Sequence, residues 1–110
     1  MSTVSTHVLD TSRGCPADGI AVQLTRVSGP GEHVAHETTD RDGRVGDLGP
    51  QGLPPGTYLL TFATAEYFAR TGTVAFFPEV CIHFCVTDPS AHYHVPVLLS
   101  PFAYSTYRGS

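Results

Sequence analysis

The sequence has little charge and contains no lysine, although it is 110 residues long. Only 15% of its residues are charged, against about 25% in an average protein, and all six basic residues are arginines. A net charge of −4 without a basic cluster argues against nucleic-acid binding. Runs of about 18 apolar residues are absent, so the sequence predicts no membrane-spanning helix. The low charge indicates a surface that is neutral or partly covered by partner subunits.

Cysteine is scarce and odd in number. The three cysteines, Cys15, Cys81 and Cys85, argue against a disulfide framework and favour a reducing compartment. Residues 1–7 contain neither the basic segment nor the apolar core of a signal peptide. We therefore expect a cytoplasmic location.

Glycine and proline, by contrast, are abundant and spread along the chain, with 11 glycines and 9 prolines. This distribution is typical of many short strands joined by turns. Strand-forming residues, several of them alternating with polar ones, fill most segments between the turns. Strands are expected over residues 5–10, 20–27, 57–64, 81–86, 92–99 and 104–107.

Only one segment favours a helix. Residues 65–70 hold good or neutral helix formers, with Thr64 as the expected N-cap and Gly72 as the expected C-cap. Seven or eight short strands with one short helix predict an all-β fold, an antiparallel β-sandwich. A chain of this length makes one domain, over residues 1–110. Pro96 should lie at an edge, a bulge or an unpaired position, because it has no N–H to donate.

The first candidate for chemistry is the alternation of Cys81, His83 and Cys85. On a strand these side chains share one face, which could indicate a metal site. Residues four apart on a strand are separated by about 13 Å, however, whereas a zinc–sulfur bond is about 2.3 Å long. The two thiols cannot reach one ion without a bend, so we interpret the segment as a sheet face without metal.

Two of the six histidines are spaced to act together. His92 and His94 point to the same face of a strand, a little under about 7 Å apart. This spacing suits a metal pair or an acid/base pair, but two ordinary surface histidines would have it too. His7 lies in an early strand, and an isolated strand histidine is more often structural than chemical.

Two arginines stand out by position. Arg44 follows the turn signal at residues 40–43, where an exposed hairpin arginine would be ordinary. Arg108 lies in an aromatic and apolar run close to the C-terminus. Because chain ends usually fray, such a run predicts that this segment is docked.

Five segments together resemble the transthyretin-like proteins. They are Ser-Thr-His-Val-Leu-Asp-Thr at 5–11, Gly-Cys-Pro-Ala at 14–17, Asp-Gly-Arg at 42–44, the His-Tyr-His-Val-Pro run from 92 to 101, and residues 104–110, which end in Tyr-Arg-Gly-Ser. The resemblance covers essentially the whole chain. Within the family the chain is most similar to the branch that hydrolyses 5-hydroxyisourate.

The resemblance implies an eight-stranded two-sheet sandwich with a short helix after the fifth strand. It also implies a homotetramer, a dimer of dimers with ligand sites in a channel between the dimers. The implied reaction is hydrolysis of 5-hydroxyisourate to 2-oxo-4-hydroxy-4-carboxy-5-ureidoimidazoline in urate degradation, without a metal or organic cofactor. The implied catalytic residues are His7, Arg44, His94 and Tyr107. Arg108, Gly109 and Ser110 should help to shape the pocket, with His92 and Ser105 nearby.

The chemistry expected at such a site is attack of water on a ring carbonyl of a cyclic amide. A histidine with a pKa near neutrality can take the proton of the water, and a second one can assist. Arg44 offers a planar set of donors to the developing negative charge. Tyr107 can donate from its hydroxyl or stack on the flat ring. The alternatives are a non-catalytic small-ligand carrier of the same fold, a β-sandwich adhesion module, and a metal-binding protein that uses His92 and His94.

Overall fold

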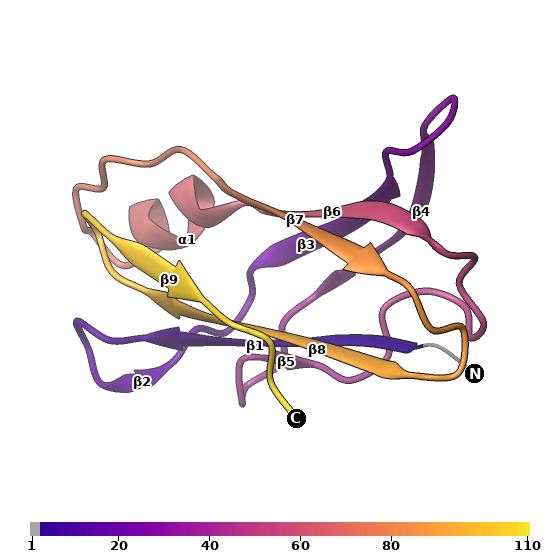
Figure 1. Ribbon diagram of the computed structural model, residues 1–110. Coiled ribbons are helices and arrows are strands. Elements are labelled where there is room, and N and C mark those ends of the chain that lie inside the picture. The colour runs from indigo at the N-terminus through magenta and orange to yellow at the C-terminus, as the bar shows by residue number, and fades with distance from the viewer. Residues whose placement is uncertain (1–2) are drawn as a thin grey trace.

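A computed structural model describes residues 3–110, which form two stacked β-sheets (Figure 1). The first sheet consists of β3 (Ala21–Arg26), β4 (Glu32–Thr38), β6 (Gly56–Phe62) and β7 (Val80–Val86), in the order β4-β3-β6-β7. The second consists of β1 (Thr3–Asp10), β2 (Cys15–Pro16), β5 (Arg44–Val45), β8 (His92–Leu99) and β9 (Tyr104–Thr106). Its order is β2-β1-β8-β9, with β5 also paired to β1. The predicted all-β sandwich is confirmed, and three of its strands, β2, β4 and β5, lie outside the ranges expected from the sequence.

The core lies between the two sheets and is built by strand alternation. In β7, Ile82 and Val86 are buried, whereas Cys81, His83 and Cys85 are exposed on the opposite face, as the sequence predicted. The same period of two buries one face of β3, β6 and β8, whereas β4 has no fully buried residue. The largest fully buried side chains include Tyr58, Phe62, Ile20, Leu24, Leu48, Leu60 and Leu99.

One strand pair departs from the predicted antiparallel arrangement. β1 and β8 run parallel, in register from Thr3 opposite His92 to Asp10 opposite Leu99. A hairpin forces its two strands to run antiparallel, but these two strands are joined by a long crossover that includes the whole first sheet. Their direction was therefore not encoded in any local turn.

Pro96 lies in the middle of β8, opposite His7 of β1 but unpaired on the side that faces β9. Backbone N–H and C=O groups of residues two apart on a strand point to the same edge of that strand. The carbonyl of His94 accepts a hydrogen bond from the Gly109 N–H. The backbone nitrogen of Pro96 therefore also faces the C-terminal segment. The ladder with β9 begins only at Val97, opposite Thr106. The missing N–H of Pro96 therefore interrupts no rung of the ladder, as predicted.

The helix α1 (Thr64–Arg70) confirms the predicted helical segment, extended by one residue. Thr64 is not its N-cap: Ala63 holds that position without a side-chain cap, because its N–H still bonds to Ala21 in the sheet and the helix starts directly afterwards. Thr71 is the C-cap, and Gly72 follows with φ +67°, its N–H bonded to the carbonyl of Ala69. Gly72 was therefore wrong as the C-cap by one residue, although the helix does end next to it.

A buried carboxylate joins α1 to β1. The Tyr67 hydroxyl donates to Asp10 over 2.7 Å, and Ser12 and the Arg13 N–H donate to the other carboxylate oxygen. Burial alone would raise the pKa of Asp10, but these hydrogen bonds outweigh it and hold the pKa below its ordinary value. Burial and the Asp10 hydrogen bond raise the pKa of Tyr67 to about 12.

Among the described residues no helix is long and apolar enough to cross a membrane.

Candidate functional site

The polar residues of β1 and β8 gather on the outer face of the second sheet. In β1, Val4 and Val8 are buried in the core, so Ser5 and His7 point outward. In β8, the core side is taken by Tyr93, Val95, Val97 and Leu99, which leaves His92 and His94 on the outer face. The parallel register places Ser5 beside His94. Two segments far apart in sequence thus combine into one polar surface.

A tight turn brings Arg44 to the same face. The Asp40 carboxylate accepts the backbone N–H groups of Asp42 and Arg44, over 2.9 and 3.0 Å, and these bonds hold the pKa of Asp40 below its ordinary value. Gly43 has φ +74°, and a Cβ there would lie 2.3 Å from the carbonyl oxygen of Val8. Only glycine fits this turn.

The turn sets Arg44 opposite His7 in the antiparallel β1–β5 pair. Direct partners in such a pair project to the same face. Arg44 and His7 are therefore neighbours on the outer face, and Arg44 is exposed.

Ser5 connects the two histidines of β8. Its Oγ lies 2.8 Å from Nε2 of His92 and 2.7 Å from Nδ1 of His94. The Thr3 hydroxyl is hydrogen-bonded to Nδ1 of His92. The two imidazole rings are stacked, with centroids 6.4 Å apart and planes inclined by 14°, close to the spacing that the sequence predicted.

The C-terminal segment is docked against His94, as its composition predicted. The Gly109 N–H donates to the His94 carbonyl over 2.8 Å. A Cβ on Gly109 would lie 2.5 Å from Cδ2 of the His94 ring, so only glycine allows the backbone to pass this close. The contact carries Ser110 to the edge of the polar surface.

These residues surround a hollow of about 240 Å³. It is lined by Ser5, Thr6, Arg44, Val45, Gly46, His92, His94 and Ser110. Six of these eight residues carry a polar or cationic side chain. The hollow brings together Arg44, His92, His94 and Ser110 from the sequence prediction, with His7 adjacent through its pairing with Arg44.

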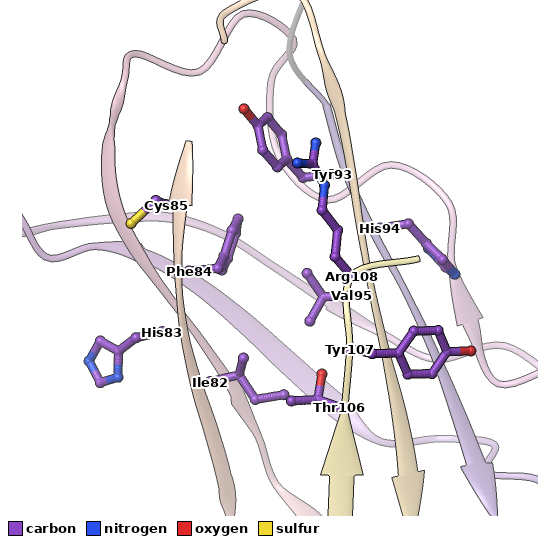
Figure 2. A pocket seen from close by; sticks show the side chains of 10 residues that line it. All are labelled: Ile82, His83, Phe84, Cys85, Tyr93, His94, Val95, Thr106, Tyr107 and Arg108. Carbon is purple, nitrogen blue, oxygen red and sulfur yellow. The ribbon is translucent and has the colours of Figure 1, made fainter. Parts of the chain in front are cut away.

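Tyr107 and Arg108 line a different, more apolar cavity of about 290 Å³ between β7 and the C-terminal segment (Figure 2). The Arg108 guanidinium lies over the ring of Tyr93, 4.7 Å from its centroid. His94 lines this cavity as well, and Figure 2 shows its ring and that of Tyr107 directed to the same side, away from Phe84. The structure therefore does not place Tyr107 or Arg108 in the lining of the polar hollow; His94 is the predicted site residue that lines both cavities.

Ser105 is not brought together with the other predicted site residues. It is exposed in β9 opposite Leu98, four residues from His94 along β8. Four residues of strand correspond to about 13 Å. Ser105 lines neither cavity described above.

The electrostatic environment keeps His94 neutral at pH 7. Burial of the imidazole lowers its pKa below the ordinary 6.5, and the positive charge of Arg44 lowers it further, followed by His92 and His7. A neutral imidazole can accept a proton from water. The arrangement therefore offers a base, with a cationic donor group in the same hollow.

Sequence reasoning missed Ser5 and Thr3, which hold the two histidines. Their signal was the alternation of Thr3, Ser5 and His7, which places all three on one face. This alternation alone does not show that Thr3 and Ser5 contact the histidines, because the contact depends on the parallel register of β1 and β8. Within residues 3–110 no cluster of three or more His, Cys, Asp or Glu side chains has the geometry of a metal site.

The sequence and the fold match known proteins. A family model described as the HIUase/Transthyretin family matches residues 4–109. The 5-hydroxyisourate hydrolase of Deinococcus radiodurans is 48% identical, with 97% of this chain and 95% of the relative covered. The solved structure of Klebsiella pneumoniae 5-hydroxyisourate hydrolase is 42% identical with a TM-score of 0.88, and covers 98% of this chain and 99% of its own. Sea bream transthyretin in complex with thyroxine superposes with the same TM-score of 0.88 at 28% identity, covering 97% and 94%.

Proposed function

The chain belongs to the HIUase/transthyretin family, and we propose that it hydrolyses 5-hydroxyisourate to 2-oxo-4-hydroxy-4-carboxy-5-ureidoimidazoline in urate degradation. The observation that carries this proposal is the polar hollow in which neutral His94 and cationic Arg44 meet. Two 5-hydroxyisourate hydrolases, identical to this chain at 42% and 48% of positions, support the same activity.

His94 acts as the general base in this proposal. Its Nδ1 is occupied by Ser5, which leaves Nε2 to take a proton from the attacking water. Because its pKa lies below 6.5, the imidazole is in the basic form at neutral pH. The side chain is half-buried, so the orientation of the ring is fixed before substrate binds.

Arg44 and His7 act on the substrate carbonyl and the leaving nitrogen. Arg44 supplies planar N–H donors that match urate-like carbonyls and stabilise the oxyanion formed by water attack. His7 lies beside Arg44 and donates a proton to the departing ring nitrogen or holds the water. No Ser or Cys nucleophile with an adjacent base is needed, since the water attacks directly.

The remaining predicted residues shape the substrate pocket. Tyr107 donates from its exposed hydroxyl or stacks on the flat substrate, and Ser110 and His92 complete the rim of the hollow. Arg108 acts indirectly, since its contact with Tyr93 anchors the segment that carries Tyr107 and Ser110. Ser105 remains the weakest of the proposed contacts because of its distance along the strand.

A small-ligand carrier of the same fold is the second candidate. Sea bream transthyretin, whose structure contains thyroxine, has the same fold at 28% identity. Two imidazoles, a guanidinium and hydroxyl groups in one hollow favour hydrolysis, since a carrier needs no base poised for proton transfer.

The proposed enzyme is a homotetramer, a dimer of dimers, in the cytoplasm. Assembly is supported by the low charge of the chain and by the exposure of large apolar side chains. These are Val74, Phe76, Phe102, Tyr104 and Tyr107. A cytoplasmic location is supported by three free thiols, two of them exposed.

An absorbance assay tests the activity directly. Urate oxidase generates 5-hydroxyisourate in place, and its decay is followed with and without the protein. We expect the protein to accelerate decay, and His94→Ala to lower kcat by about 100-fold or more without changing the thermal unfolding midpoint by more than a few degrees. Decay at the uncatalysed rate with the parent protein would favour the carrier.

A further inference from the structure

The Ser5 hydroxyl lies between two imidazole nitrogens and contacts both. It is 7% exposed, and its oxygen is 2.8 Å from Nε2 of His92 and 2.7 Å from Nδ1 of His94. A hydroxyl has one proton to donate and lone pairs to accept. If Ser5 donates to His92 it must accept from His94, and if it donates to His94 it must accept from His92. The tautomers of the two histidines are therefore coupled.

In one arrangement Nε2 of His94 is a base. His94 then carries its proton on Nδ1 and donates it to Ser5, while Ser5 donates to Nε2 of His92. The Nδ1–H of His92 donates to the hydroxyl of Thr3, which completes the chain at its outer end. In the opposite arrangement Thr3 donates inward, and His94 presents an N–H at Nε2 instead of a lone pair.

The surroundings of the two histidines differ. His94 is half-buried and faces Arg44 from β5, His7 from β1 and His92 from its own strand, with Ser110 at the rim. His92 is exposed and has Thr3 and Ser5 as its hydrogen-bond partners. A positive charge on half-buried His94 would lie near the Arg44 guanidinium, whereas the same charge on His92 would be exposed to solvent.

We propose that Ser5 is a positioning residue that relays a proton between His94 and His92, so that exposed His92 stores the proton taken from the attacking water. The proposal rests on the proposed hydrolase function and extends it. The water proton binds Nε2 of His94, the Nδ1 proton of His94 passes to Ser5, and the Ser5 proton passes to His92. His92 becomes the imidazolium, and His94 stays neutral with an N–H at Nε2.

Of the two roles proposed for His7, the relay leaves it the one of holding the water, because His94 supplies the proton for the leaving group. The relay then runs in reverse. The Nε2 proton of His94 goes to the departing ring nitrogen, Ser5 returns a proton to Nδ1 of His94, and Nε2 of His92 returns one to Ser5. One proton has moved from water to the leaving nitrogen, and every group of the relay has its starting proton. The same imidazole serves first as base and then as acid.

Chemical rescue separates the relay from a structural role. We expect Ser5→Ala and His92→Ala each to lower kcat by about 10-fold or more, a part of what general acid–base catalysis contributes, with KM changed less than about twofold. Imidazole added to the buffer should restore much of the kcat of His92→Ala, because the vacated position is open to solvent. It should not rescue the double variant Ser5→Ala/His92→Ala, which lacks the connecting hydroxyl.

Ser100→Ala is the matched control. Ser100 also lies next to β8 and hydrogen-bonds through its hydroxyl to the Ala103 carbonyl, but at the far end from His94. We expect parent kcat in this variant. Thermal unfolding of each variant checks the fold. If Ser5→Ala does not fold, the rescue of His92→Ala by imidazole is the test of the relay.

Nitrogen NMR of the imidazoles gives a readout that does not depend on turnover. We expect the ¹⁵N shifts of His94 to move toward a single tautomer in Ser5→Ala. Parent-like kcat in Ser5→Ala and His92→Ala, or equal rescue of the single and double variants, would overturn the relay while the hydrolase function stands. Absence of hydrolysis by the parent protein would instead contradict the proposed function, and the NMR shifts would still test the coupling.

Discussion

At the scale of single residues, the site depends on close contacts that only one residue type satisfies. Gly43 and Gly109 are both required by space: one lets the turn before Arg44 approach Val8, and the other lets the C-terminal segment cross the His94 ring. These glycines contribute no chemical group. They determine the positions of Arg44 and of the segment packed on His94, and therefore the geometry of the site.

The pH dependence of catalysis should report the environment of His94. Because only the neutral imidazole accepts a proton and its pKa lies below 6.5, kcat/KM should be at its plateau at pH 7 and fall as the pH drops through that pKa. Arg44→Gln removes a positive charge that lowers this pKa, so the acid limb should move to higher pH. The measurement is a pH profile from 4.5 to 8, with Arg41→Gln, in the same turn, as the control. An unmoved limb in Arg44→Gln would contradict the assignment of His94 as the base.

Gly109→Ala should impair catalysis more than stability. A Cβ placed 2.5 Å from Cδ2 of His94 must displace either the ring or the C-terminal segment. We expect kcat to fall by about 10-fold or more, while the free energy of unfolding changes by less than about 1 kcal/mol, since the segment is largely exposed. Steady-state kinetics and urea unfolding measure the two effects. Full activity in this variant would show that the ring tolerates the shift.

At the scale of elements, α1 is fastened to the sandwich by one polar contact as well as by apolar packing. Tyr67 and Phe68 are buried, and the Tyr67 hydroxyl reaches the buried carboxylate of Asp10 at the end of β1. Asp10 has a lowered pKa in the folded state, so its carboxylate stabilises the fold above the unfolded pKa. This contribution is lost as the pH falls through the lower, folded pKa.

Tyr67→Phe should therefore destabilise the protein in a pH-dependent way. The variant leaves a buried carboxylate short of one donor, which costs about 1–3 kcal/mol at pH 7. The difference from the parent should shrink as the pH falls from about 4, where the unfolded carboxyl becomes protonated, through the lower pKa of Asp10 in the folded protein. Urea unfolding at pH 7 and pH 3 measures this, with the exposed Tyr104→Phe as the control. A difference that is equal at both pH values would mean that the loss comes from packing alone.

The elements also show what the sequence could predict. The alternation of apolar and polar residues predicted β7 and the exposure of Cys81 and Cys85. Gly72 predicted the end of α1 to within one residue. Both signals are local in the sequence. Thr64 was wrong as N-cap, since the sheet continues through Ala63 and the helix begins without a cap. The roles of Ser5 and Thr3 could not be predicted, because they depend on a parallel register between strands far apart in sequence.

At the scale of the whole molecule, the large apolar side chains left exposed and the low charge indicate a surface that is covered on assembly. In the proposed dimer of dimers, the sites would lie between the dimers. We therefore expect light scattering to give about four times the mass of one chain, and activity per chain to fall when dilution separates the dimers. A monomer with undiminished activity at all concentrations would contradict both statements.

The parallel pairing of β1 with β8 has a consequence for the order of events during synthesis. β1 leaves the ribosome first, and its partner follows about 80 residues later, which at 5–20 residues per second is a delay on the order of 4 to 16 seconds. The antiparallel pairs β3–β4 and β6–β7 are closer in sequence and can form during this interval. Until β8 is synthesised, the nascent chain contains the β1 part of the polar surface without the β8 part. Competence for catalysis appears in a single late step, when β8 inserts beside β1.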